Sequence, residues 1–398
     1  MRVALVVAGP WPALRGSQVL VGHLALGLRA RGHVVDVITY GRRLGRRPGL
    51  GPSRPFLDAW LALRLAWHVR RHRVEVMHAH NYEAALAALA VRSLSGCPLV
   101  YHGHCAMAEE LPTYVTTPAA RRLLARVGAW LDSSVPRRAE FCIAVTDELG
   151  RHLEQGGVGP AALACIPPAG VPGEIREGSP AAPGAVPRLG RDGDGARPGR
   201  AGDPLVCYAG NLDGYQNLEF LLGSFALVRD EMPAARLQLV THADAQAHAA
   251  RLAARGLGAG VEIVVARSYD EVRERLASAA VAVSPRAERS GFPMKLLNYM
   301  AAGKPIVACE GSAKVLRQGE TAMVVPNGDE AAFADAVLNL LENPAERQRI
   351  GAGARMAVRD LCCWDTMVDR IEGIYMGVLA RRRAERRRPS VASAGLLK

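Results

Sequence analysis

The chain has 398 residues, of which 49% are hydrophobic and 22% are charged, and it carries a formal net charge of +12 at pH 7. This length exceeds what one hydrophobic core usually serves, so two globular domains are expected and a disordered or fibrous protein is excluded. Every run of 18 residues contains charged or polar positions, which argues against a helix that spans a membrane.

The positive charge is unevenly distributed. Half of the excess lies in the last 18 residues, in the run RRRAERRR and Lys398. This basic run is short and has no interleaved aromatic residues, so nucleic acid is not an expected partner. The remaining charge is ordinary for a protein that binds anionic substrates or lies near an acidic membrane surface.

The N-terminal segment does not resemble a secretory signal, and the cysteines do not form a metal framework. The opening MRVALVVAGPWP has a short apolar run that leads into a glycine loop, so we expect a cytoplasmic protein. The eight cysteines include no C-x-x-C pair, and several lie in apolar runs, which predicts buried free thiols. Because they lack finger-like spacing, no metal site is expected.

Strands and helices alternate through residues 1–172. The apolar runs RVALVVA, GHVVDVIT, VEVMHAH, CPLVYHGH and FCIAVT predict strands at 2–8, 32–39, 74–80, 97–104 and 141–146. Helical patterns follow the first strand and recur at 58–72, 83–94 and about 118–131. Alternating elements of these lengths predict an α/β domain with a parallel sheet covered by helices on both faces.

A second alternating series occupies residues 204–363. It runs from the strand PLVCYAG to the strand VAVSP and includes a helix expected near 243–256. Residues 173–203 separate the two series, and their density of glycine, proline and charge predicts a flexible linker. A last long helix is expected at 364–384, followed by a basic disordered tail at 385–398.

The loops that follow strands are the expected location of function, because ligands of parallel sheets bind beyond the carboxyl ends of the strands. In the first such loop, Gly16 and Ser17 precede a helix whose free amides could approach a phosphate closely. A plain tight turn in which Ser17 caps the helix explains this stretch equally well.

Histidines gather at two other predicted strand ends. His102, His104 and Glu109 lie in the stretch LVYHGHCAMAEELP, and a histidine at a strand end can orient a substrate or stabilise developing charge. An ordinary hydrogen-bonded histidine is the alternative in each case. His78 and His80 alternate along a predicted strand and can simply line the edge of the core.

Two loops of the second series place polar residues before a helix. Gly210 follows a strand, and residues 211–217 lead into a helix. In the other loop, the stretch 290–292 (SGF) opens a helix on which Lys295 and Asn298 project one turn apart. Backbone amides in such a loop could hold a sugar or a phosphate.

From residue 1 to about 380 the chain resembles the glycosyltransferase family 4 group of GT-B enzymes. The matching stretches are RGSQVL, RARGHVVDVIT, IAVTDEL, YAGNL, SGFPMKLLNYMAAGKPIV and GETAMVVPNGD, in the order and spacing of that group. The resemblance implies two Rossmann-like domains facing across a cleft, with a C-terminal helix returning toward the first domain. It also implies a metal-independent hexosyltransferase that uses a nucleotide sugar, needs no other cofactor and retains the anomeric configuration.

The resemblance assigns roles to individual residues. Gly16 corresponds to the family's phosphate-approaching glycine, and His104 corresponds to its strand-end histidine near the donor sugar. Glu288 lies two residues before the place of a family glutamate, so His104 and Glu288 are the expected catalytic residues. The expected donor-binding residues are Gly16, Ser17, Gly210, Asn211, Gln216, Ser290, Gly291, Phe292, Pro293, Met294, Lys295 and Asn298.

Four charged groups of the family are replaced here by neutral polar ones. Asn211 and Gln216 stand where the family has the arginine and lysine of a cationic clamp on the diphosphate, and Ser290 and Asn298 stand at its paired glutamates. Because one donor aimed at the developing charge can be worth ~3 kcal/mol in catalysis, the loss is severe unless another cation substitutes. The candidates are Arg15, Arg267, Arg286, Arg289 and Lys295.

These replacements keep more than one function open. Transfer of a sugar from a nucleotide sugar to a saccharide, lipid or small-molecule acceptor is the leading hypothesis, so a nucleotide sugar and a saccharide or lipid-linked acceptor are the expected partners. A non-catalytic sugar- or nucleotide-binding partner of another transferase, and a nucleotide-sugar epimerase, are the alternatives.

Two basic amphipathic stretches of the first domain bear on location. WLALRLAWHVRRHR and ARRLLARVGAWL, with the arginine-rich tail, predict peripheral contact with anionic lipid at the inner face of the cell membrane. A solvated helix face with a disordered tail is equally compatible with these stretches.

Overall fold

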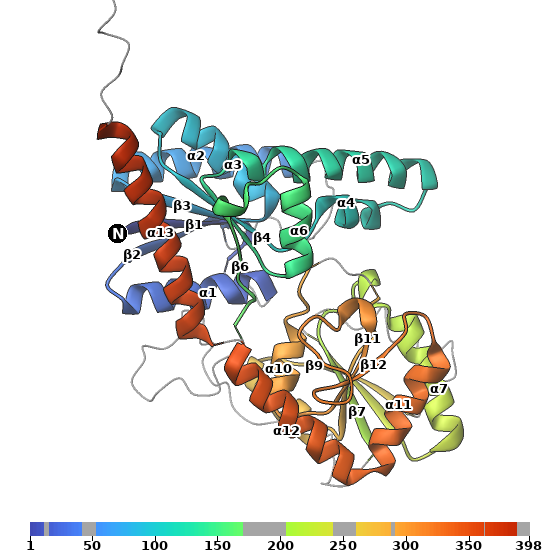
Figure 1. The fold of residues 1–398 in the computed structure, drawn as a ribbon. Coiled ribbons are helices and arrows are strands. Elements are labelled where there is room, and N and C mark those ends of the chain that lie inside the picture. The colour runs from blue at the N-terminus through green and yellow to red at the C-terminus, as the bar shows by residue number, and fades with distance from the viewer. Residues whose placement is uncertain are drawn as a thin grey trace, which may run out of the picture. The chain divides into compact units, whose positions relative to one another are not determined.

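The computed structural model describes residues 1–11, 16–41, 53–169, 204–241, 260–287, 291–361 and 363–387. The chain forms two compact units (Figure 1): unit 1 comprises Met1–Pro168 with Trp364–Lys398, and unit 2 comprises Ala169–Cys363. The linker expected at 173–203, the helix expected near 243–256, and the site residues Glu288 and Ser290 lie outside the described residues.

Unit 1 is built on a six-stranded parallel sheet with the strand order β2-β1-β3-β4-β5-β6. The strands are β1 (Arg2–Pro10), β2 (Val34–Gly41), β3 (Val76–His80), β4 (Leu99–Gly103), β5 (Phe141–Ala144) and β6 (Leu163–Cys165). The central strands β3 and β4 are buried along their whole length, which explains why their sequences are nearly continuous apolar runs. The predicted parallel sheet is confirmed.

Helices cover both faces of this sheet. They are α1 (Gly16–Ala30), α2 (Arg54–His72), α3 (Asn81–Ser95), α4 (Met107–Glu110), α5 (Pro118–Ser134), α6 (Asp147–Gln155) and α13 (Trp364–Arg387), with short 3-10 turns η1 (Leu111–Tyr114), η2 (Pro136–Arg138) and η3 (Pro160–Ala162). In Figure 1, α2 and α3 lie on one side of the sheet and α1 lies on the other.

The C-terminal helix α13 belongs to unit 1, as the family resemblance implied. It packs against α1, and its inner face buries Val368, Ile371 and Tyr375 completely or nearly so. Gly27 of α1 makes this approach possible, because a Cβ atom there would lie only 2.7 Å from Cγ2 of Val368. The end of the chain therefore completes the core of the domain in which the chain began.

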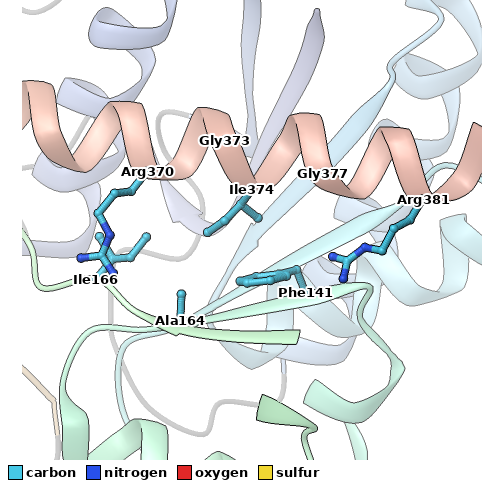
Figure 2. Close-up of a pocket in the computed structure, with 8 residues that line it drawn as sticks. All are labelled: Phe141, Ala164, Ile166, Arg370, Gly373, Ile374, Gly377 and Arg381. Atoms are coloured by element: carbon cyan, nitrogen blue, oxygen red, sulfur yellow. The ribbon is translucent and has the colours of Figure 1, made fainter. Parts of the chain in front are cut away.

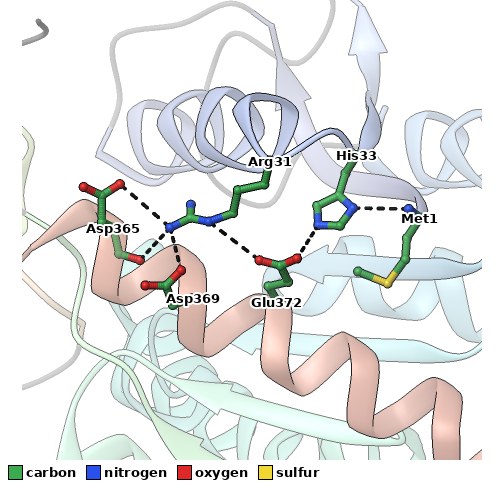
Figure 3. Close-up of polar contacts among 6 residues, drawn as sticks. All are labelled: Met1, Arg31, His33, Asp365, Asp369 and Glu372. Carbon is green, nitrogen blue, oxygen red and sulfur yellow. Dashed lines mark hydrogen bonds and ion pairs between the residues drawn. The ribbon is translucent and has the colours of Figure 1, made fainter.

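A network of polar contacts flanks this helix pair (Figure 3). Arg31 Nη2 lies 2.6 Å from Asp369 Oδ1, and Arg31 Nε lies 3.6 Å from Glu372 Oε2. Glu372 also contacts His33 Nε2 at 2.8 Å, while the ammonium of Met1 donates to His33 Nδ1 at 3.2 Å. Exposed ion pairs contribute little singly, but a shared network reduces the entropy lost per contact.

Unit 2 is built on a second six-stranded parallel sheet, with the order β12-β11-β10-β7-β8-β9. Its strands are β7 (Leu205–Ala209), β8 (Arg236–Thr241), β9 (Val261–Val265), β10 (Val281–Ser284), β11 (Ile306–Cys309) and β12 (Met323–Val325). Its helices are α7 (Leu218–Glu231), α9 (Tyr269–Ser278), α10 (Lys295–Ala301), α11 (Glu330–Glu342) and α12 (Pro344–Leu361), with the turns η4 (Gly214–Gln216) and η5 (Glu310–Ser312).

Strand β7 shows how the sequence builds two cores in unit 2. Val206 and Tyr208 join the core beneath α7 and α11, whereas Leu205 and Cys207 join the core beneath α10 and α12. Successive side chains of a strand point to opposite faces, so an uninterrupted apolar run is what a sheet buried on both sides requires.

Each sheet has one topological switch point, where the strand order reverses. In unit 1, β2 pairs with one side of β1 and β3 with the other; in unit 2, β8 pairs with one side of β7 and β10 with the other. Ligands of open parallel sheets bind beyond the carboxyl ends of the strands at such points. The loops after β1, β3, β7 and β10 are therefore the places to look for a site.

The free cysteines of the described residues are mostly shielded from solvent. Cys97, Cys142, Cys207 and Cys309 are buried free thiols, as predicted, whereas Cys363 is exposed. Burial raises the pKa of the Cys207 thiol to about 12, so it is unreactive at neutral pH. In the described parts of the chain, no helix combines the length and the apolar character needed to cross a bilayer.

Candidate active site

Several of the predicted donor-binding residues lie at the carboxyl end of β7 in unit 2. Gly210 directly follows the strand, and its amide continues the ladder by donating to the Val240 carbonyl at 2.9 Å. A Cβ atom at Gly210 would lie 3.4 Å from Lys295 Nζ and 3.2 Å from the Tyr208 hydroxyl. The glycine thus leaves just enough room for a lysine from α10 to reach the end of β7.

Lys295 places its ammonium at this strand end. The ammonium donates to the Tyr208 hydroxyl at 2.9 Å and to Gln216 Oε1 at 2.5 Å, and it lies 4.1 Å from the centroid of the Tyr208 ring. Burial, and secondly the positive charge of Arg286, lower the pKa of Lys295 well below its usual value. A cation therefore contacts the very side chain, Gln216, that stands in place of the expected clamp lysine.

A second cation lies near the other replaced clamp residue. Asn211 donates through Nδ2 to the Tyr215 hydroxyl at 2.8 Å, and the guanidinium carbon of Arg286 lies 5.1 Å from the centroid of the Tyr215 ring. Arg286 follows strand β10, the neighbour of β7 across the switch point. The β10 loop and α10 thus bring two cations to the loop after β7, where the two expected ones are absent.

Most of the other predicted donor-binding residues near α10 shape the loop before this helix, and Asn298 offers a polar side chain. Gly291 has φ of +73°, a left-handed conformation that favours glycine. Phe292 and Met294 pack against the core on the α10 side, and Pro293 is buried, so these residues hold the loop in place. The side-chain oxygen of Asn298, Oδ1, is buried, and no described residue donates a hydrogen bond to it.

His104 lies immediately after β4 in unit 1, one residue beyond the strand end. It is half-buried, and its Nε2 lies 3.1 Å from Nδ1 of the buried His80 at the end of β3. Burial lowers the pKa of His104 to about 4. A neutral imidazole at neutral pH suits a role in orienting a substrate through a hydrogen bond, and it makes a poor proton acceptor.

The other residues of the β4 loop take different places. The Glu109 side chain is exposed on α4, and its neighbour Glu110 is the carboxylate that contacts the Cys105 thiol and accepts from the Tyr114 hydroxyl at 2.6 Å. His102 is buried beneath the loop. His102 is thus the buried penultimate residue of β4, whereas the Glu109 side chain lies on α4, beyond the strand end.

Sequence reasoning missed the residue that anchors this loop. Asp132 of α5 is buried and accepts from the amides of Met107 and Ala108 at 2.9 and 3.0 Å, and it also contacts His152 Nε2 at 2.9 Å. It thereby satisfies free amides of the first turn of α4. No local pattern marks this aspartate, because its partners lie about 20 residues or more away in either direction.

The first loop of unit 1 is only partly described. Helix α1 begins at Gly16, so Ser17 lies inside the first turn and does not precede the helix as a cap would. Gln18, which the sequence did not single out, is buried and donates through Nε2 to the Pro10 carbonyl at 3.2 Å. Arg15, one of the candidate replacement cations, lies outside the described residues, and so does Arg289.

A cavity of about 500 Å³ lies elsewhere in unit 1, along α13 (Figure 2). Phe141, Ile166 and Ile374 form its apolar lining, and Arg370 and Arg381 extend into it from the helix. None of the residues expected to bind donor or acceptor lines it. The loops after the strands, and not this cavity, carry the candidate site.

One further group in unit 1 has the composition of a metal site. The ring nitrogens of His78, His80 and His102 lie within 4.8 Å of one another. The His78 and His102 rings are stacked at an angle of 8°, and the His78 and His80 rings at 22°. Because ring lone pairs lie in the ring plane, stacked rings do not direct them to a common point, and the arrangement favours hydrogen bonds over coordination.

Two family profiles match the chain, one in each unit. The profile described as Glycosyltransferase Family 4 matches residues 14–169, and the profile described as Glycosyl transferases group 1 matches residues 203–343. Together they cover the predicted acceptor and donor halves, including the loops after β3, β4, β7 and β10.

Curated relatives align over nearly the whole chain. A phosphatidyl-myo-inositol mannosyltransferase of Mycobacterium leprae is 27% identical, and the alignment covers 94% of this chain and 96% of that protein. A glycogen synthase of Mycobacterium tuberculosis is 25% identical, with 85% of this chain and 76% of that protein covered. The full two-unit arrangement of the sequence is therefore shared with glycosyltransferases.

Solved structures of glycosyltransferases share the fold. Sucrose-phosphate synthase from Thermosynechococcus elongatus superposes with a TM-score of 0.77 at 18% identity, and the alignment covers 96% of this chain and 99% of that protein's chain. Anabaena HepE in complex with UDP-glucose has a TM-score of 0.68 at 13% identity and covers 97% of this chain and 100% of its own. With matching family profiles on both halves, the chain is a glycosyltransferase of the GT-B fold and belongs to the family 4 group.

Proposed function

We propose that this enzyme transfers a sugar from a nucleoside diphosphate sugar, with retention of configuration, and that Lys295 and Arg286 replace the missing clamp on the diphosphate. The observation that carries the proposal is the position of the Lys295 ammonium, which is bonded to Gln216 beside Gly210. No metal or other cofactor is required in this proposal, because two protein cations face the leaving group.

The chemistry explains why the cations matter. Breaking the bond between sugar and diphosphate leaves negative charge on the diphosphate, and a preorganised donor at such a charge is worth ~3 kcal/mol. Lys295 is held by Tyr208 and Gln216, so its side-chain nitrogen is already positioned before a ligand arrives. Arg286 adds a planar guanidinium, a geometry suited to binding two phosphate oxygens.

A donor panel tests this proposal. UDP-glucose, with which Anabaena HepE was crystallised, and nucleotide-activated mannose, suggested by the mannosyltransferase relative, are the first donors to supply with saccharide and lipid acceptors. Release of the nucleoside diphosphate is the measurement. Donor binding without turnover would favour a non-catalytic partner, and conversion of the nucleotide sugar without acceptor would favour an epimerase.

Substitution of Lys295 tests the clamp itself. Lys295→Gln should lower kcat/KM by about 10²-fold, the effect of ~3 kcal/mol. The matched control is Arg349→Gln on α12, which removes an exposed cation of unit 2 whose hydrogen bonds to described residues go to Glu346 and Gly319. Equal activity of Lys295→Gln and the control, with both proteins folded, would refute the replacement clamp.

We further propose that unit 1 rests on an anionic membrane surface at the cytoplasmic face, where a lipid-linked acceptor would be reached. Phe56, Trp60, Leu63 and Trp67 of α2 are spaced by four, three and four residues and so share one face of the helix. They are exposed, from 49% for Trp60 to 78% for Phe56. Apolar side chains on a helix face are how interfacial helices insert between lipid headgroups.

Helix α5 has the same character. Leu123, Val127 and Trp130 are exposed on one face, and the neighbouring Arg122 and Arg126 are exposed as well. In Figure 1, α2 and α5 both lie along the upper side of unit 1. Cations beside an apolar face match the negative potential of the cytoplasmic leaflet.

Liposome sedimentation tests the membrane proposal. Vesicles containing anionic lipid should retain the protein at low salt, and a Trp60→Ser/Trp67→Ser variant should be released. Met356→Ser, which removes an exposed methionine from α12 of unit 2, is the control and should bind like the unaltered protein. Absence of binding to anionic vesicles at low salt would dispose of the proposal.

A further inference from the structure

Four imidazoles form a stack at the carboxyl ends of β3 and β4. His78 and His80 lie two residues apart on β3, and His102 and His104 lie two residues apart at the end of β4, so each pair shares one face. His80 and His102 are register partners across the two strands. Neighbouring rings lie with their centroids 4.5 to 5.4 Å apart.

Hydrogen bonds divide this stack into two chains. In the first, the Tyr375 hydroxyl of α13 contacts His78 Nδ1 at 2.5 Å, and His78 Nε2 contacts His102 Nδ1 at 3.1 Å. In the second, His80 Nδ1 contacts His104 Nε2 at 3.1 Å. His104 is the half-buried member, and it is the one that the family resemblance associates with the donor sugar.

The position of the proton on each ring follows from counting the N–H groups and lone pairs that the hydrogen bonds need. Burial lowers the pKa of all four imidazoles below the usual value, so each ring is neutral at neutral pH, with one N–H and one lone pair. Each hydrogen bond between two rings then needs one N–H and one lone pair. The direction of the bond fixes the tautomer of both rings.

Two nitrogens without partners decide the direction. Nε2 of His80 and Nε2 of His102 are buried, and no described residue bonds to either. A buried N–H without an acceptor is rarer and more costly than a buried lone pair without a donor. In the second chain, which ends at His104, the proton of His80 therefore belongs on Nδ1, so His80 donates to His104.

We propose that His80 is a positioning residue that holds His104 as the tautomer with its proton on Nδ1, so that His104 presents an N–H to a hydroxyl or ring oxygen of the bound sugar. His80 itself touches no substrate and acts through the Nδ1 to Nε2 contact. The sugar-binding part of this proposal rests on the proposed function, whereas the tautomer is a property of the free protein.

The tautomer can be read directly by NMR. In protein labelled with ¹⁵N-histidine, a long-range ¹H–¹⁵N correlation spectrum distinguishes Nδ1–H from Nε2–H rings, and His104→Gln identifies the His104 signals by their loss. We expect the Nδ1–H pattern for His104 in the free protein. An Nε2–H pattern would overturn the proposal, whether or not any donor is turned over.

Two substitutions of His80 separate positioning from a merely structural role. His80→Phe keeps a ring in the stack and removes the donor, so His104 should lose the pure Nδ1–H pattern and kcat should fall roughly tenfold, with KM for the donor little changed. His80→Asn keeps an amide N–H at the place of Nδ1 and should retain both the tautomer and most of the activity.

His68→Asn on α2 is the matched control, since it removes another imidazole of unit 1, one bonded to Asp36. It should leave the His104 pattern and kcat unchanged. If His104 keeps the Nδ1–H pattern in His80→Phe, or if His80→Asn loses it, the assignment to His80 is wrong. If the tautomers behave as expected but no sugar donor is consumed, the proposed function fails and the positioning role stands.

Discussion

Lowering the pH from about 6.5 to about 5.5 should destabilise unit 1 through the histidine stack. In the folded protein, burial keeps the pKa values of His78, His80 and His102 well below the usual 6.5. In the unfolded chain they return to about 6.5. The unfolded chain therefore binds more protons below pH 6.5, so the stability that is fully present above this pH is lost as the pH falls.

The size of the effect follows from the number of buried rings. For one histidine that is protonated only when unfolded, the free energy of unfolding falls by ~1 kcal/mol over this interval. Three such rings, together with His104, whose pKa burial lowers to about 4, give a loss of ~4 kcal/mol, a large share of the 5–15 kcal/mol that is typical of a domain. Replacing His80 with phenylalanine should make the loss ~1 kcal/mol smaller.

Urea unfolding followed by tryptophan fluorescence measures this loss for unit 1 alone, because all five tryptophans of the chain belong to that unit. The free energy of unfolding is extrapolated at each pH from the same linear dependence on urea. A loss below ~1 kcal/mol for the unaltered protein, or an equal loss in His80→Phe, would refute the reasoning that the stack is neutral and buried.

Three further outcomes are expected. Binding of a nucleoside diphosphate should be accompanied by the uptake of as much as one proton, at a pH between the lowered pKa of Lys295 and its usual 10.5, because the anion favours the charged amine. Calorimetry in buffers of different ionisation enthalpy measures this proton uptake. Uptake that persists in Lys295→Gln would contradict the prediction. Gly128→Ala should lower the free energy of unfolding, measured with urea, by ~1–3 kcal/mol, because the alanine Cβ would lie 2.3 Å from the Met107 carbonyl oxygen. An unchanged urea midpoint would show that α4 and α5 do not meet there. Glu372→Gln should cost no more than ~1 kcal/mol in thermal unfolding and only at low salt, because its partner Arg31 is partly exposed; a loss that persists at high salt would mean that the pair is not screened.

The sheets could be predicted from the sequence because each buried strand is a short, nearly continuous apolar run, as in VMHAH at β3 and LVYHG at β4. The position of the loops followed from the alternation of strands and helices. Both are local properties of the chain, and local patterns are what a single sequence expresses most strongly.

The contacts within the site could not be predicted in the same way. Lys295 meets Gln216 across 79 residues, and this contact exists only because β10 lies beside β7, a neighbour relation set by the order of strands in the sheet. The pairing of His80 with His104 likewise depends on the register of β3 against β4. The sequence marked Lys295 as one of several possible cations, and three-dimensional packing selected it.

The membership of α13 in unit 1 has a consequence for how the protein is made. Tyr375, Ile371 and Val368 belong to the core of a domain whose other elements end at residue 168. During synthesis from the N-terminus, the first domain must therefore wait, with the α1 surface around Gly27 uncovered, until all of unit 2 has emerged from the ribosome. Unit 2 is contiguous and can finish folding first, so the last domain to begin is the first to be complete.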